Sequence, residues 1–198
     1  MKITVNPERR EWNKLTQRYE AGDQDIAASV EQIVCQVRDQ GDEAIIKLSA
    51  SIDGVKLSRI EVPSDIVASA ADKIRPELRK AIDTAAGNIR KFHTAQLCKG
   101  IDMETLPGVR CLQRNVPVNR VGLYVPGGSA PLFSTVLMLA IPAKVAGCSE
   151  IILCTPPSGD DDVSQEILYA ASVCGVDRGF LLGGAQAIAA MAFGTQSI

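Results

Sequence analysis

The sequence predicts an α/β fold, in which an N-terminal helical α+β segment (1–118) precedes an incomplete Rossmann-like parallel βαβαβα half-domain (119–198). Two observations carry this prediction. Apolar residues recur at helical spacing through most of the first segment, as they do in amphipathic helices. Beyond residue 119, β-rich runs alternate with helical stretches of small residues. Such alternation is typical of a parallel sheet with right-handed crossovers.

Helices dominate the first segment. They share apolar residues three and four positions apart and are expected over 8–20, over 25–40, from 42, from 63–65 and over 76–97. Asp42 can act as the N-cap of the third helix. The last and longest helix is expected to bury one stripe, made of Leu78, Ile82, Ala85, Ile89 and Phe92.

Extended elements complete the first segment. Asp53-Gly54 marks a turn, and Ile60 and Val62 predict a short strand after it. The runs 101–106 and 109–117 predict a hairpin, because the Pro107-Gly108 pair between them favours a turn.

The second segment repeats a strand–turn–helix unit three times. Its strands are β-branched or aromatic and are expected over 120–125, 150–154 and 178–182. Its helices are rich in small residues and are expected over 130–146, 163–174 and 184–194. The loop 156–162 is polar and is expected to be exposed.

Composition excludes several classes of function. The 198 residues carry a net charge of −2, so no basic surface points to nucleic acid. The start of the chain lacks the apolar centre of a signal peptide, and the most apolar stretch, 130–145, is interrupted by two prolines and a lysine. None of the six cysteines forms a CxxC pair, which favours reduced, buried thiols in a cytoplasmic protein.

The first candidate site is the turn Pro126-Gly127-Gly128-Ser129. It follows a predicted strand, and ligands of open α/β sheets bind at the carboxyl ends of the strands. Glycines let backbone amides approach a phosphate, and the start of the next helix favours an anion. The turn is not a GxGxxG motif, and a tight strand-to-helix turn with Ser129 as the cap is an equal alternative.

The second candidate turn, Gly183-Gly184-Ala185-Gln186, occupies the equivalent place after the third strand. Gln186 can hydrogen-bond a ribose or an amide, or it can simply be a polar residue at a helix start. Tyr124, at the end of the first strand, can stack on a cofactor ring or fill the core. Two glycine turns at one edge of a sheet indicate a ligand site more strongly than either turn alone.

Other polar residues favour ordinary structural roles. His93, the only histidine, lies on a predicted helix and is interpreted as structural. The run from Asp160 to Asp162 is interpreted as a solvated acidic loop. No complete acid–base set and no metal-ligand set can be assembled from the sequence. The residues by themselves thus support a nucleotide-binding half-domain and name no reaction.

Several motifs, in order along the chain, resemble the histidinol dehydrogenase family. The resemblance runs from about Val30 to the end of the sequence. It is carried by RDQGDEA (38–44), FHTAQ (92–96), PGVRC (107–111), RVGLYVPGGSAPLFSTVLMLAIPAKVAGC (120–148) and GGAQAIAAMAFGT (183–195).

The resemblance implies an enzyme that oxidises L-histidinol to L-histidine in two NAD-dependent steps, as a homodimer with one zinc ion per site. Tyr124 and Gln186 match family positions that contact NAD, and Pro126, Gly127 and Gly128 match the turn lining that site. Neither the zinc ligands nor the Glu-His acid–base pair of the family has a counterpart here. One departure is Ile52, where the family often has phenylalanine.

The sequence ends at Ile198, before the catalytic half that the resemblance implies, so we expect the chain alone to be inactive. The alternative is a non-enzymatic module that binds a nucleotide or a partner through the same turns. In either case the last strand is expected to be a bare sheet edge, with exposed apolar surface over 181–193 and a tendency to associate.

Overall fold

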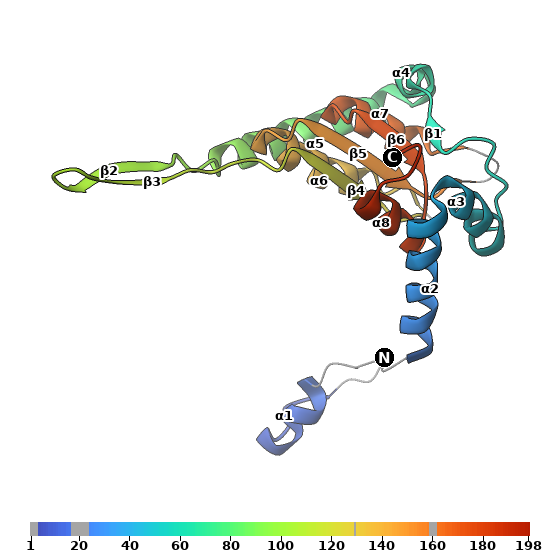
Figure 1. Cartoon of the computed structure of the whole chain (residues 1–198), viewed down its shortest axis with the longest axis horizontal. Coiled ribbons are helices and arrows are strands. Elements are labelled where there is room, and N and C mark those ends of the chain that lie inside the picture. The colour runs from blue at the N-terminus through green and yellow to red at the C-terminus, as the bar shows by residue number, and fades with distance from the viewer. Residues whose placement is uncertain (1–3, 17–23, 129, 159–161) are drawn as a thin grey trace.

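A four-stranded sheet lies at the centre of the fold (Figure 1). The computed structural model describes residues 4–16, 24–128, 130–158 and 162–198. The strands follow one another across the sheet in the order β1–β6–β5–β4. Their bounds are β1 (Glu61–Val62), β4 (Arg120–Tyr124), β5 (Glu150–Thr155) and β6 (Arg178–Leu181).

The expected βαβαβα unit is confirmed. Strand β5 pairs in parallel with both β4 and β6. The helices that follow the three strands are α6 (Phe133–Ala146), α7 (Gln165–Cys174) and α8 (Gly184–Phe193). Helix α6 begins three residues later than expected: Pro131 disfavours helical geometry at Ala130, and Leu132, with a ψ of 48°, is not yet helical. Its N-cap position is Leu132, and Ser129 lies outside the described residues.

Strand β1 corrects one expectation. It pairs antiparallel with β6, so that Glu61 lies opposite Phe180 and Val62 opposite Gly179. The last strand is therefore covered, and among the described strands β4 lies at the free edge of this side of the sheet. The sequence reveals that 60–62 is extended, but an extended pattern carries no information about which strand it joins.

The expected apolar surface over 181–193 is only partly present. Leu181 and Leu182 are fully buried, whereas Ile188 and Phe193 are each about half exposed, at 51% and 53%. The helix α8 thus buries one side and leaves two large apolar side chains in solvent.

Helices cover both faces of the sheet. Strand β5 alternates, with Ile151 and Leu153 in one apolar core and Ile152 and Cys154 in the other, as a strand buried on both faces does. The first core is closed by α4 (Ser64–Lys73), α5 (Pro76–Ala95), α6 and α7, and the second by α2 (Gln24–Gln40), α3 (Asp42–Leu48) and α8. Both cores combine residues from before and after position 119.

Helix α5 follows its expected stripe except at the end. Ile82 is buried, and Leu78, Ala85 and Ile89 pack against the first core. Phe92 is 64% exposed, so its expected burial is wrong. Its ring contacts only the edge of His93 among the described aromatic residues, because α5 runs on beyond the sheet toward the hairpin (Figure 1).

The expected hairpin projects from the body of the fold (Figure 1). Strands β2 (Ile101–Leu106) and β3 (Val109–Gln113) pair antiparallel, and every residue of both strands is exposed. Gly108 has a φ of 82° in the turn, a conformation that glycine adopts without strain. Strand β3 ends four residues before the expected limit of 117.

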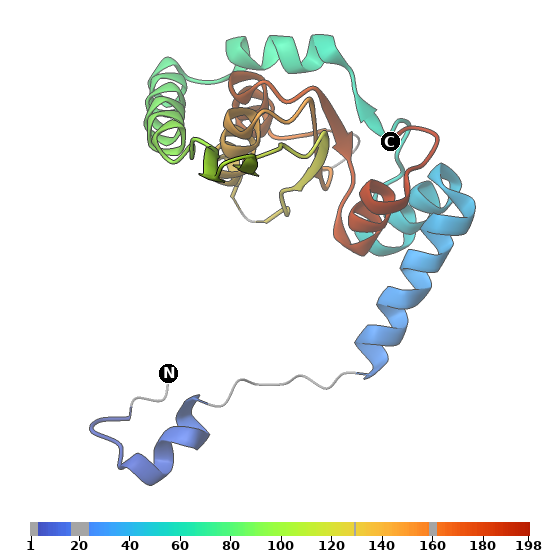
Figure 2. The same cartoon turned by 60° about the vertical axis from the view of Figure 1, so that its left-hand side comes forward.

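Helix α1 and the N-terminal part of α2 extend away from the sheet (Figure 2). Helix α1 (Arg9–Thr16) buries none of its residues, and positions 17–20 of the first expected helix lie outside the described residues. Helix α3 runs into a single π-helical turn, η1 (Ser49–Asp53), which Gly54 ends with a φ of 70°. The expected turn at Asp53-Gly54 is thereby confirmed.

Two smaller expectations need correction. The carboxylate of Asp42 does not cap α3 but accepts hydrogen bonds from the backbone amide and hydroxyl of Ser197, because the end of the chain folds back onto this helix. The expected burial of the cysteines holds for Cys154 and Cys174, whereas Cys98 and Cys111 are exposed. No helix in the described part of the chain is long and apolar enough to span a bilayer.

Candidate functional site

Three turns meet at the carboxyl edge of the sheet. Because β4, β5 and β6 are parallel, the residues that follow them converge: Pro126-Gly127-Gly128, then Pro156, then Gly183-Gly184. The ladder continues one step beyond the strands, since the Val125 amide donates to Cys154 and the Leu182 amide to Thr155. The two glycine turns predicted from the sequence are thus brought to one site.

Pro156 packs between the two glycine turns. A Cβ atom at Gly127 would lie 2.7 Å from Cγ of Pro156, and one at Gly183 would lie 2.9 Å from its Cβ. Neither distance is compatible with a side chain at the glycine. The glycines therefore permit a close approach of both turns to Pro156.

Tyr124 ties the end of β4 to the start of α8. Its hydroxyl accepts a hydrogen bond from the Gly184 amide at 3.1 Å. Gly184 has a φ of 58°, a conformation that disfavours any residue with a side chain. The half-buried ring of Tyr124 packs against the second core, so the side chain is anchored at both its apolar and its polar end.

Gln186 is buried beneath this surface. It is only 1% exposed, and its Nε2 donates to Oδ2 of Asp53 at 3.1 Å. Its Oε1 lies 2.7 Å from the position of a Cβ on Gly184. Burial raises the pKa of Asp53, and the hydrogen bond from Gln186 opposes this rise to a smaller extent. Asp53 was not expected at the site, because it comes from the N-terminal segment.

A cavity of about 310 Å³ opens beside the first turn. Its wall is formed by two groups of residues. The first follows β4 and comprises Pro126, Gly127, Gly128 and Ala130–Leu132, and the second begins at the last residue of β5 and comprises Thr155–Ser158, Val163, Ser164 and Ile167. The starts of α6 and α7 both border it. The first turn of α6 holds no acidic residue, whereas α7 carries Glu166, whose carboxylate accepts from the Ser164 hydroxyl. The α6 end is therefore the better place for an anion.

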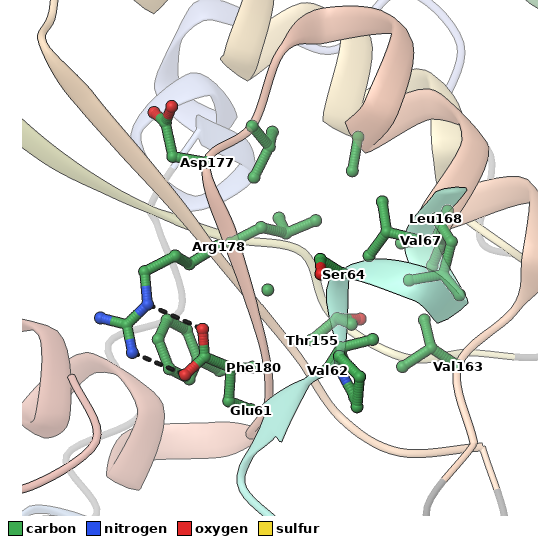
Figure 3. Close-up of a pocket in the computed structure, with 16 residues that line it drawn as sticks. Glu61, Val62, Ser64, Val67, Thr155, Val163, Leu168, Asp177, Arg178 and Phe180 are labelled. Carbon is green, nitrogen blue, oxygen red and sulfur yellow. Dashed lines mark hydrogen bonds and ion pairs between the residues drawn. The ribbon is translucent and has the colours of Figure 1, made fainter. Parts of the chain in front are cut away.

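A larger cavity of about 450 Å³ lies elsewhere, between α4, α7 and the β1–β6 pair (Figure 3). Its wall is mostly aliphatic. Glu61 and Arg178 pair with each other on one side, and Asp177 accepts from the Ile151 amide. None of the sequence-predicted site residues lines this cavity. Since its charged groups are already paired, the glycine-turn edge remains the better candidate.

The remaining polar candidates stay apart from the turns. His93 lies half-buried in the last turn of α5. Asp160 and Asp161 lie outside the described residues, and Asp162 accepts from the Val163 amide. Burial raises the pKa of the Cys154 thiol to about 12 and that of Cys174 to about 11, which makes both thiols unreactive. No group of three or more potential metal ligands occurs among the described residues.

Comparison with known proteins assigns the chain to a family. The family model for histidinol dehydrogenase matches residues 16–198. The chain belongs to the histidinol dehydrogenase family. The histidinol dehydrogenase of Bacteroides thetaiotaomicron is 46% identical over the whole chain, and that of Escherichia coli is 46% identical over 95% of it. A crystal structure of histidinol dehydrogenase from Elizabethkingia anophelis superimposes on 98% of the chain with a TM-score of 0.91 and 42% identity.

The chain spans less than half the length of these histidinol dehydrogenases. It covers 46% of the Bacteroides protein, 44% of the Escherichia coli protein and 45% of the Elizabethkingia structure. The α/β fold is shared with that structure along nearly all of the chain. The glycine-turn edge thus belongs to the N-terminal part of the histidinol dehydrogenase fold.

Proposed function

We propose that this chain provides the NAD-side portion of an enzyme that oxidises L-histidinol to L-histidine, the last steps of histidine biosynthesis. The observation that carries the proposal is the convergence of both glycine turns with Tyr124 and Gln186 at one sheet edge. Membership of the family supports the reaction, and the local geometry supports the cofactor.

The protein backbone at the glycine turns has a shape that suits NAD. Gly127 and Gly128 are exposed and carry no side chains, so a ligand at this turn would meet the backbone directly. The open start of α6, next to Gly128, would hold the pyrophosphate. The ring of Tyr124 would lie against a flat group of the cofactor. Pro126 would form one side of the site. NAD would reach the Gln186 oxygen beside Gly184, which is exposed.

When bound, NAD supplies the hydride acceptor for each of the two oxidation steps. The residues described here would bind and orient the cofactor and exclude water from one side of it. No described residue is assigned as a general acid or base. The described residues also lack a donor set for zinc, so the zinc that the resemblance implies would need ligands from elsewhere. We therefore infer that the 198-residue chain does not turn over histidinol by itself.

We further infer a homodimer in the cytoplasm for the whole enzyme. The hairpin β2–β3 supports the homodimer. A two-stranded hairpin with both faces in water is marginally stable, and this one exposes Ile101, Met103 and Leu112. A second subunit would cover these apolar side chains.

The test is a calorimetric titration of the purified chain with NAD, followed by an assay for NADH formation from L-histidinol with added zinc. We expect saturable NAD binding and no turnover. A folded chain that fails to bind NAD at millimolar concentration would contradict the cofactor assignment. Measurable oxidation of histidinol would contradict the proposed absence of activity in the chain alone.

A further inference from the structure

Asp53 reaches the site from a distant part of the chain. It ends the π-helical turn η1, and its carboxylate binds Gln186, which lies 133 positions further along. We propose that Asp53 is a positioning residue for the cofactor site, and that it acts by setting the orientation of the Gln186 amide. This proposal rests on the proposed function, because it assumes that Gln186 contacts the cofactor.

The chemistry of the two partners selects one orientation. An ionised carboxylate only accepts hydrogen bonds, so Asp53 can bind the NH2 end of the Gln186 amide and not its oxygen. The observed arrangement places Nε2 on Asp53 and Oε1 beside Gly184. A reversed amide would place two oxygens against each other in a buried space. The carboxylate thereby presents the amide oxygen toward the exposed surface at Gly184.

The carboxylate is itself held in place. The backbone amides of Gly54 and Val55 both donate to the Ser49 carbonyl, which fixes the end of η1. Oδ1 of Asp53 lies 3.5 Å from the position of a Cβ on Gly183, so the carboxylate also borders the second glycine turn. A donor such as a ribose hydroxyl at this turn would meet oriented oxygens rather than a freely rotating amide.

A second polar contact provides a matched control. The same N-terminal segment is also fastened to the end of the chain, where the Ser197 hydroxyl donates to Asp42 at 2.6 Å and the Asp42 amide donates to Gln196. Ser197→Ala removes a link between these segments without touching Asp53 or Gln186. It separates a general loosening of the segment from a specific effect on the amide.

The test measures NAD affinity by calorimetry for Asp53→Ala, Asp53→Asn, Ser197→Ala and Gln186→Ala, and follows the Gln186 side-chain amide by 15N NMR. Asp53→Ala should weaken NAD binding about tenfold, because NAD would then have to order an amide that the carboxylate holds in place in the wild-type chain. It should also speed hydrogen exchange of the Gln186 NH2 group. Asp53→Asn should restore most of the affinity, because its carbonyl oxygen can still accept from Nε2. In the Gln186→Ala background, Asp53→Ala should have no further effect.

Two results would overturn the proposal. One is an unchanged Gln186 amide signal in folded Asp53→Ala. The other is an equal loss of NAD affinity in Ser197→Ala, which would assign the effect to general loosening. If the wild-type chain does not bind NAD at all, the proposed function fails, while the amide signal still decides whether Asp53 orients Gln186.

Discussion

Glu61 and Arg178 join the two ends of the sheet-forming chain across the β1–β6 pair. Both carboxylate oxygens accept from the guanidinium, at 2.7 and 2.6 Å, in a fork geometry (Figure 3). Arg178 also donates to the Ser197 carbonyl, and its guanidinium lies 4.9 Å from the centre of the Phe180 ring. One arginine thus connects the edge strand, the last strand and the end of the chain.

This pair predicts a pH dependence of stability. Hydrogen bonding to Arg178 lowers the pKa of Glu61 below its ordinary value of 4.5. A carboxyl with a lowered pKa in the folded state stabilises the protein above its unfolded-state pKa, and this stability is lost as the pH falls through the folded-state pKa. Glu61→Gln should therefore flatten the acid limb of a plot of unfolding free energy against pH, measured by urea unfolding from about pH 3 to 7. Parallel acid limbs would contradict this. In an Arg178→Gln background, Glu61→Gln should change little.

Gly184 should tolerate alanine poorly. A side chain there would adopt an unfavourable φ of 58° and would collide with Oε1 of Gln186. We expect Gly184→Ala to lower the unfolding free energy by about 2–3 kcal/mol, measured from urea transitions. Gly108→Ala is the control, because Gly108 has a φ of 82° with open space around it and should cost only about 1 kcal/mol. Equal losses would show that Gln186 gives way at no cost.

The hydroxyl and the ring of Tyr124 should contribute separately to stability and to NAD binding. Tyr124→Phe removes the acceptor for the Gly184 amide and should cost about 1 kcal/mol of unfolding free energy. It keeps the ring, so NAD affinity should fall less than twofold, that is by less than about 0.4 kcal/mol. Tyr124→Ala should lose both stability and NAD affinity. A calorimetric titration that finds Phe and Ala equally impaired would mean that the hydroxyl, not the ring, contacts the cofactor.

Helix α5 should unfold together with the sheet. Ile82 is 1% exposed and packs in the first core with residues from the second half of the chain. Ile82→Ala should cost about 2–5 kcal/mol, and far- and near-ultraviolet circular dichroism should follow one transition. Phe92→Ala, on the exposed end of the same helix, should change the free energy by less than about 0.5 kcal/mol. Two separate transitions would instead support the division of the chain near residue 118 into independent units.

Local patterns predicted most of the helices and strands, because the periodicity of each depends only on residues that are close in the sequence. The order of strand, glycine turn and helix after residue 119 also predicted the parallel pairs, since βαβ units rarely connect in another way. The partner of β1 was not predictable. Glu61 and Arg178 are 117 positions apart, and a two-residue strand carries no register of its own.

The sequence predicted those features of the candidate site that follow from the order of strands and helices. It did not predict those that depend on contacts between distant parts of the chain. The glycine turns could be placed together because the carboxyl ends of parallel strands share an edge. Pro156 was visible only as part of a polar loop, although it separates the two turns. Asp53 was visible only as a turn residue. Its hydrogen bond with Gln186 joins the end of η1 to the start of α8, and no spacing in the sequence encodes that contact.

The β1–β6 pair has a consequence for how the protein is made. The first strand of the sheet leaves the ribosome more than a hundred residues before its only strand partner among the described elements. At typical translation rates that interval lasts roughly 6 to 23 seconds. Until then β1 has no strand to pair with, and α4 and α5 can pack only on the elements that emerge in the meantime, α6 and α7 among them. The antiparallel edge of the sheet therefore closes last, once residue 181 has been synthesised.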